Sequence, residues 1–404
     1  MSTYNRVVAA DENASLAPTV RARLATEMAD PASDVGASLS GTFVPQSGSR
    51  TTVLGDSVDA SPKGWFPYFT IRGSIPVARN AGVGGERLDQ HSVRFGADVA
   101  PYAPDIVIFG GATNDLSQGR TDSDIRASIE TIADKIAIIG AIGVVRTSPP
   151  TDNAATTGTV TDHRQRIMTH NAWLKNWAML RGVTVLDIHK FVVDPLTGGY
   201  TSGQTDDGTH PNEAAYSAIA DGLLVGGLPK PFRSEFSLGR IVTDASNMFP
   251  NGVCALDTSG NGLPDSWAKA GVTVSLVSEV GIVGKWLHVV NSAAGAGLVQ
   301  LDAPGTSFDA GDHVQIAGRV KASAATWTTP ASEGVRVILQ FVGGGIQINI
   351  ADYVHEGLNG IFSYEQIVPA GTTAIRFQLY TIGKTGETVD VAELAGRNIT
   401  RLRA

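Results

Sequence analysis

The sequence predicts an α/β domain with a parallel sheet, followed by an all-β sandwich of the jelly-roll kind. Between Thr51 and Pro231, short apolar runs alternate with stretches of helical periodicity, which is typical of parallel strands covered by helices on both faces. From about Gly271 onward, β-rich runs are separated by turns that contain glycine, and no convincing helical pattern appears. The length of 404 residues leaves room for two or three domains of ordinary size.

The α/β part is expected to contain five strands and three long helices. Its apolar runs are rich in Val and Ile, and the segments between them repeat apolar residues with a helical period. The predicted strands are residues 51–54, 74–78, 105–110, 142–147 and 183–188, and the predicted helices are residues 122–139, 163–181 and 211–224.

An N-terminal appendage precedes the α/β domain. Four apolar residues recur at every fourth position between Leu16 and Met28, which predicts one amphipathic helix that ends near Pro31. The predicted organisation is a helical leader (1–46), the α/β domain (47–235), a linker (236–250) and the β-sandwich (251–404).

The composition excludes several classes of protein. With 31 Lys and Arg against 39 Asp and Glu, the net charge is −8 and neither half of the chain is basic, which argues against a nucleic-acid-binding protein. No run approaches the roughly 18 apolar residues of a membrane span, and the first residues lack the apolar region of a secretory signal. We therefore expect a soluble chain whose localisation the sequence leaves open, with virion association or an extracellular location as possibilities.

Polar residues of a distinctive kind follow the predicted strands. In a parallel α/β sheet, ligands bind at the carboxyl ends of the strands, so these residues are expected to share one site. The first strand leads into Asp56-Ser57, the second into a glycine-rich loop that ends at Gly85, the third into Asn114-Asp115, and the fifth, after a loop, into Asp207 and His210.

These residue types fit acyl transfer. A serine hydroxyl is a weak nucleophile near neutral pH, so Ser57 requires a base, for which His210 is the candidate. Asp207 lies three residues before His210 and is predicted to orient its ring. The oxyanion of a tetrahedral intermediate requires fixed donors, which we assign to the backbone N–H groups of Ser57 and Gly85 and the side-chain amide of Asn114.

The four blocks, in this order, resemble those of the SGNH/GDSL hydrolases, whose letters are matched by Ser57, Gly85, Asn114 and His210. The resemblance covers about 180 residues, from Thr51 to Pro231. It implies a flavodoxin-like three-layer α/β/α fold, with Asp207 as the triad acid and no cofactor for catalysis. Activities in that family are those of serine esterases, lipases, thioesterases and carbohydrate O-deacetylases.

Three features of this part of the sequence leave the assignment of site residues open to alternatives. The third block usually has glycine where this chain has Ala112, and in the second block Gly82 and Gly84 compete with Gly85 for the oxyanion role. Four aromatic residues that closely follow Ser57 are more readily explained by core packing than by a substrate subsite; they are Trp65, Phe66, Tyr68 and Phe69.

A second candidate site lies at the start of the predicted sandwich. Oxygen-bearing side chains alternate there with Gly262 at the sixth position, which is similar to a calcium loop although the acidic residues at loop positions three and twelve are missing. A metal-free turn explains the pattern almost equally well. The candidate calcium ligands are Asp257, Ser259, Asn261 and Asp265.

Two weaker resemblances bear on partners. The segment from Asp257 to Trp267 is similar to the entry of carbohydrate-binding-module-like jelly rolls, although a sandwich that only packs, oligomerises or acts as a spacer is the alternative. Residues 8–46 faintly resemble leaders of phage tail-associated proteins, which would imply assembly into a virion through this segment or the sandwich.

The sequence as a whole predicts a serine esterase that removes acetyl or other short acyl groups from a glycan or another small ester. Two alternatives stay open: a lipase or thioesterase acting on free acyl esters, and a phage tail or receptor-binding module. In that module the α/β domain would be either a host-polysaccharide esterase or a silent scaffold.

Overall fold

The computed structural model describes residues 50–225, 238–239, 244, 246–322, 333–355 and 357–402. Residues 48–404 form one compact unit. The helix predicted between residues 15 and 31, like the rest of the predicted leader, lies outside the described residues.

The first five strands form a parallel sheet, as predicted. They are β1 (Thr51–Gly55), β2 (Val77–Gly82), β3 (Ile106–Gly110), β4 (Ile142–Arg146) and β5 (Thr184–Leu186), in the spatial order β5-β4-β3-β1-β2. Four of the predicted ranges agree to within three residues at either end. The second prediction is displaced: the strand begins at Val77 and continues to Gly82, so Asn80 lies within the strand and not after it.

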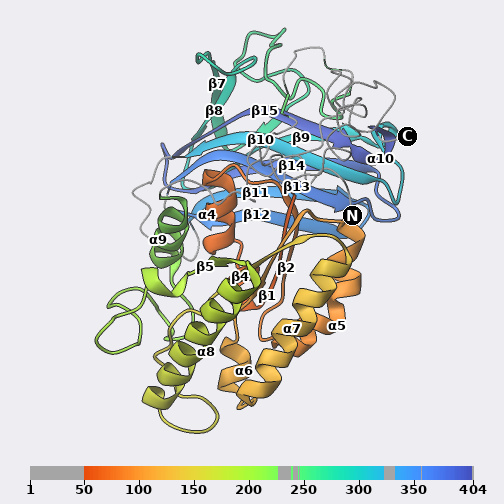
Figure 1. Cartoon of the computed structure of the whole chain (residues 1–404). Helices are drawn as coiled ribbons and strands as arrows, with labels where there is room; N and C mark the ends of the chain where they lie inside the picture. The colour runs from red at the N-terminus through yellow and green to blue at the C-terminus, as the bar shows by residue number, and fades with distance from the viewer. Residues whose placement is uncertain are drawn as a thin grey trace, which may run out of the picture. The chain divides into compact units, whose positions relative to one another are not determined.

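Helices cover both faces of this sheet, which confirms the predicted three-layer α/β/α fold (Figure 1). On one face, residues such as Val53 and Ile108 contact the first and last helices of the domain; on the other, Leu54 and Phe109 contact the middle helices. The first group comprises α3 (Ser57–Ala60), α4 (Trp65–Arg72) and α9 (Glu213–Leu224); the second comprises α5 (Leu88–Asp98), α7 (Asp122–Ile138) and α8 (Val160–Arg181), with the short α6 (Thr113–Ser117) beside α8.

The C-terminal part is all-β, as predicted, and its jelly-roll topology stays a prediction. Its strands pair antiparallel with one another. One five-stranded sheet has the order β12-β11-β14-β9-β6, and the other strands follow one another as β13-β10-β15-β8-β7. A single helical turn, α10 (Ile399–Leu402), follows the last strand. The strands are β6 (Ala268–Ala270), β7 (Val272–Val277), β8 (Trp286–Asn291), β9 (Gly295–Pro304), β10 (His313–Ala322), β11 (Gly334–Val342), β12 (Ile346–Val354), β13 (Leu358–Ile367), β14 (Ala374–Gly383) and β15 (Thr388–Asn398).

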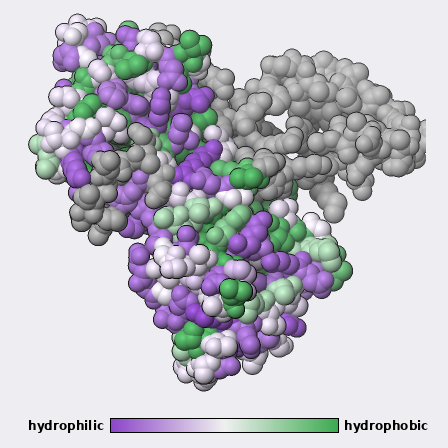
Figure 2. All heavy atoms as spheres, turned by 90° about the vertical axis from the view of Figure 1, so that its left-hand side faces the viewer, coloured by the Kyte–Doolittle hydropathy of each residue, from purple (hydrophilic) through white to green (hydrophobic). Residues whose placement is uncertain are grey.

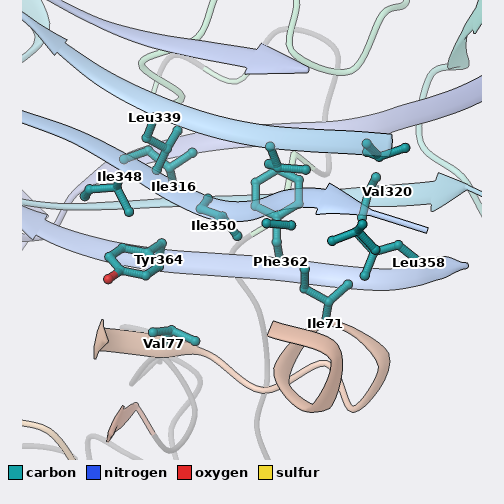
Figure 3. Close-up of a cluster of buried hydrophobic side chains, with 14 of the residues drawn as sticks. Ile71, Val77, Ile316, Val320, Leu339, Ile348, Ile350, Leu358, Phe362 and Tyr364 are labelled. Atoms are coloured by element: carbon teal, nitrogen blue, oxygen red, sulfur yellow. The ribbon is translucent and has the colours of Figure 1, made fainter. Parts of the chain in front are cut away.

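The two sheets of the sandwich pack face to face through apolar side chains. Phe362 on β13 stacks on Phe377 on β14, with ring centroids 5.6 Å apart and planes 5° from parallel. Branched aliphatic residues from both sheets belong to the same buried cluster as these rings, among them Ile316 and Leu339 (Figure 3).

The sandwich continues the sheet of the α/β domain. Strand β13 pairs in parallel with β2 through one bridge, between Tyr364 and Val77, so a single ten-stranded sheet extends from β5 to β7. Helix α4 also packs on β13, where Ile71 lies close to Phe362 and Leu358 (Figure 3). Part of the predicted linker belongs to this core as well, because Phe249 is buried.

Among the described residues, no helix combines the length and the apolarity needed to cross a membrane. On the face shown in Figure 2, hydrophilic and hydrophobic residues are intermixed over both the α/β part and the sandwich.

Candidate active site

Ser57 lies where the sheet meets its first helix. Strand β1 ends at Gly55, and Ser57 is the first residue of α3, so the end of the central strand presents its hydroxyl group. Asp56 caps the helix, because its side chain accepts a hydrogen bond of 2.9 Å from the backbone N–H of Val58. The backbone N–H of Ser57 has no acceptor among the hydrogen bonds of the described residues.

The structure brings Ser57, His210 and Asp207 into one chain of hydrogen bonds. The Nε2 atom of His210 is 2.8 Å from the Oγ atom of Ser57, and its Nδ1 atom is 2.7 Å from Oδ2 of Asp207. An ionised carboxylate only accepts hydrogen bonds, so Nδ1 carries the proton and Nε2 accepts the hydrogen of the Ser57 hydroxyl. This is the arrangement in which a histidine acts as a general base toward a serine.

The Asp207 carboxylate is held in its ionised form. Partial burial raises its pKa, but hydrogen bonds from the His210 backbone N–H and ring and from the Thr209 backbone N–H outweigh that effect and lower the pKa to about 2. Asp207 therefore stays charged over the ordinary assay range of pH, where it can stabilise a protonated His210 ring.

The loop that carries Asp207 and His210 is fastened at several points. The hydroxyl of Thr205 donates to the His210 carbonyl at 2.7 Å, and that of Tyr200 donates to the Thr209 carbonyl at 2.8 Å. The side-chain amide of Asn153 donates to the Asp207 carbonyl at 2.9 Å and to the Thr209 hydroxyl at 2.6 Å. Asn153 could not be predicted as a site residue, because it lies more than fifty residues away in a loop without a recognisable motif.

Hydrogen bonds join the loops that carry the predicted oxyanion donors Gly85 and Asn114 to each other and to the end of β1. Asn114 donates one amide hydrogen to the Glu86 carbonyl at 2.9 Å, which fixes the side chain and leaves its second N–H for a ligand. In the glycine-rich loop, the N–H of Gly82 donates to the Asn80 side chain, so Gly82 is used internally. The N–H groups of Gly84 and Gly85 have no acceptor among the described residues, and a Cβ atom on Gly84 would lie 3.8 Å from that of Ser57.

A second set of side chains fixes the glycine-rich loop, and sequence reasoning missed it. Arg94 donates from Nε to the Glu86 carboxylate at 2.5 Å and from Nη2 to the Gly55 carbonyl at 3.0 Å. The same guanidinium thus joins the residue after Gly85 to the residue two positions before Ser57. Since Glu86 also accepts the hydrogen bond from Asn114, three of the four blocks are tied together at this point.

A buried ionic cluster supports the nucleophile from beneath. Arg146, at the end of β4, donates from Nε to Asp59 at 2.7 Å and from Nη2 to Asp56 at 3.0 Å. All three side chains are at most 1% exposed. Burial alone would lower the pKa of Arg146, but the two carboxylates raise it above its ordinary value, so the guanidinium stays charged.

This cluster explains two glycines of the blocks. A Cβ atom on Gly55 would lie 1.7 Å from a carboxylate oxygen of Asp59, and one on Gly111 would lie 2.1 Å from Nη1 of Arg146. Gly111 also has a φ of +74°, which favours glycine, whereas Ala112 has a φ of −120°, which any residue adopts. Alanine at position 112 is therefore compatible with the site.

The aromatic residues after Ser57 pack in the core, the interpretation that the sequence favoured. Each is at most 2% exposed, and all belong to the same buried cluster; they are Trp65, Phe66, Tyr68 and Phe69. They cannot line an open subsite in this arrangement.

The candidate calcium ligands are engaged within their own loop. The Asp257 carboxylate accepts hydrogen bonds from two backbone N–H groups and from the Ser259 hydroxyl, and Asp265 accepts two from Thr258. Asn261 caps another backbone N–H at 2.9 Å. In the described part of the chain, no three His, Cys, Asp or Glu side chains are grouped to hold a metal ion. The metal-free turn accounts for this pattern, and calcium stays an unsupported prediction.

Comparison with known proteins gives one family. Residues 47–218 match the sequence model of the GDSL-like lipase/acylhydrolase family. Among solved structures, a GDSL-like lipase from Bacteroides thetaiotaomicron is 20% identical, over 54% of this chain and 94% of its own, with a TM-score of 0.38. The psychrotrophic esterase EstA from Pseudoalteromonas is 16% identical, over 43% of this chain and 94% of its own, with a TM-score of 0.35. No curated protein matches the sequence.

Proposed function

We propose that this chain is a serine esterase that removes acetyl or other short acyl groups from a glycan; the match of residues 47–218 to the GDSL-like lipase/acylhydrolase family supports the proposal. The observation that carries the proposal is the chain of hydrogen bonds from Ser57 through His210 to Asp207. Together with free backbone donors beside the serine, this arrangement supports acyl transfer and needs no cofactor.

The reaction proceeds through an acyl-enzyme. The Oγ atom of Ser57 attacks the ester carbonyl carbon while its proton passes to Nε2 of His210, and Asp207 stabilises the resulting imidazolium. The carbonyl oxygen becomes an oxyanion, which the N–H groups of Ser57, Gly85 and Asn114 bind. His210 then returns the proton to the departing alcohol oxygen. Water attacks the acyl-enzyme with the same proton relay, which releases the carboxylic acid and restores Ser57.

Two observations support a short acyl group on a polar substrate. The aromatic side chains that follow Ser57 in the sequence are buried in the core, so they offer no apolar channel for a long chain. The loops that approach His210 carry exposed polar residues, of which Asn153 and Asp206 are examples, although Val83 of the glycine-rich loop is exposed as well. Amide and carboxylate groups of this kind suit the hydroxyl groups of a sugar.

The acyl preference tests this proposal. We expect hydrolysis of p-nitrophenyl acetate to exceed that of the butyrate, and hydrolysis of the palmitate to be at least a hundredfold slower, because a long chain has no apolar subsite. Acetate release from an acetylated polysaccharide is measured in parallel, with a variant that lacks the Ser57 hydroxyl as background. A preference for palmitate would favour a lipase instead. Hydrolysis of the small esters without acetate release from the polysaccharide would contradict a glycan as the substrate.

Assembly and location stay predictions. Attachment to a virion through residues 1–46 or through the sandwich, and sugar binding by the sandwich, have the sequence resemblances alone as support. Electron microscopy of virions labelled with an antibody against this chain would decide the first, because an unlabelled virion contradicts it.

A further inference from the structure

The sandwich contacts the helix that follows the catalytic loop. Helix α9 begins at Glu213, three residues after His210, and Asn212 caps it by accepting a hydrogen bond of 3.1 Å from the Ala215 backbone N–H. Asn212 also donates to the Gly203 carbonyl at 2.8 Å, which closes the loop that carries the triad residues. Asn212 thus joins the two ends of this loop, and any group that holds the neighbouring Glu213 in place also holds these ends in place.

The carboxylate of Glu213 is held by three donors from two parts of the chain. Tyr68 on α4 donates its hydroxyl hydrogen at 2.5 Å, and His355 of the sandwich donates its backbone N–H at 2.6 Å. The Nδ1 atom of His355 contacts the second carboxylate oxygen. Its Nε2 atom is 2.6 Å from the Glu333 carbonyl. Both ring nitrogens thus face acceptors, and the contact with Glu213 is nearly buried, because the side chain of Glu213 is 11% exposed and that of His355 is 12% exposed.

A second connection reaches the nucleophile. The hydroxyl oxygen of Tyr364 on β13 accepts a hydrogen bond of 2.9 Å from the backbone N–H of Asn80. The Asn80 side chain in turn donates to the Asp59 carbonyl in helix α3 at 2.9 Å and accepts from the Gly82 N–H at 3.0 Å. Asn80 therefore links the sandwich both to the helix that begins with Ser57 and to the glycine-rich loop.

We propose that the sandwich positions the active site. His355 holds the loop of Asp207 and His210 in place through Glu213. Tyr364 holds helix α3 and the glycine-rich loop in place through Asn80. This inference rests on the proposed esterase function. It assigns the sandwich a part in catalysis in addition to any targeting role. The two connections approach opposite sides of the triad, one on the side of His210 and the other on the side of Ser57, so they determine the distance between base and nucleophile.

Two substitutions test the two connections separately. His355→Gln removes the imidazole ring that contacts Glu213, and Tyr364→Phe removes only the hydroxyl that Asn80 contacts. Displacement of reacting groups by about 1 Å lowers rates by up to about a hundredfold. We expect each variant to lower kcat five- to twentyfold, with KM within twofold of the wild-type value. Kinetics are measured at least 20 °C below the melting temperature of each variant, and circular dichroism confirms folding.

Arg50→Lys is the matched control. Arg50 also joins the two parts of the chain, because its Nε atom donates to the Glu365 carboxylate at 3.0 Å, but it precedes the amino end of β1, whereas Ser57 follows the carboxyl end of that strand. We expect this variant to lose thermal stability and to keep its kcat. A kcat within twofold of wild type for His355→Gln or for Tyr364→Phe would overturn the corresponding connection. Absence of any esterase activity in the wild-type protein would instead contradict the proposed function itself.

Discussion

Replacing Ser57 by alanine is expected to lower kcat by about a millionfold, because the variant has no nucleophile to form the acyl-enzyme. In serine hydrolases with a comparable triad, loss of the serine alone costs about as much as loss of the whole triad. Replacing His210 by alanine in the same chain is therefore expected to cause little further loss. The residual rate is measured with p-nitrophenyl acetate at enzyme concentrations high enough to detect turnover over several hours.

Ser61→Ala provides the control for this comparison. Ser61 directly follows the short helix that begins with Ser57. Its substitution removes the same hydroxyl oxygen from a side chain that is not part of the triad. Its kcat is expected to stay within twofold of the wild-type value. If Ser57→Ala retained more than about one-hundredth of the wild-type kcat, a water molecule activated by His210 would replace the covalent mechanism.

Replacing Arg146 by methionine is expected to destabilise the protein by about 3–5 kcal/mol. The substitution keeps much of the side-chain volume but leaves the carboxylates of Asp56 and Asp59 buried without their cation, which is the costly way to break a buried ion pair. The free energy of unfolding is measured by urea denaturation followed by circular dichroism. Activity is expected to fall as well, because Asp56 and Asp59 hold the turn around Ser57.

Arg376→Met separates burial from pairing. Arg376 makes two hydrogen bonds of 2.8 Å to Asp302 on the sandwich, but its side chain is 29% exposed and that of Asp302 is 40% exposed. Solvent screens such a pair, so its loss is expected to cost about 1 kcal/mol or less. Equal losses of unfolding free energy in Arg146→Met and Arg376→Met would contradict the claim that the buried ion pairs contribute more than the exposed one.

The sequence was sufficient to predict the triad because its parts lie at the ends of recognisable strands. The apolar runs predict the strands, parallel strands end at one edge, and the residues at that edge have to meet. Asp207 and His210 are in addition three residues apart on one loop, so their contact needs only local geometry. The parallel strands and the triad could therefore be predicted from patterns that are short-range in the sequence.

The supporting groups could not be predicted in this way, because their partners are far apart in the sequence. Arg146 lies 87 residues from Asp59, and His355 lies 142 residues from Glu213. Each is an ordinary charged residue in its own segment, and only the packed structure makes it a partner. The predicted end of the second strand was wrong for a related reason. Asn80 is polar and therefore was expected to follow the strand, but it lies within β2 and pairs with Val53 of β1.

Covalent labelling is the measurement that tests the central claim most directly, namely that Ser57 is an activated nucleophile. The wild-type chain is treated with diethyl p-nitrophenyl phosphate, and the modified residue is located by mass spectrometry of its peptides. We expect one diethylphosphoryl group per chain, bound to Ser57, with loss of esterase activity in proportion to labelling and with greatly slowed labelling in His210→Ala. Complete loss of activity with Ser57 unmodified, or with the label on another residue, would contradict the account.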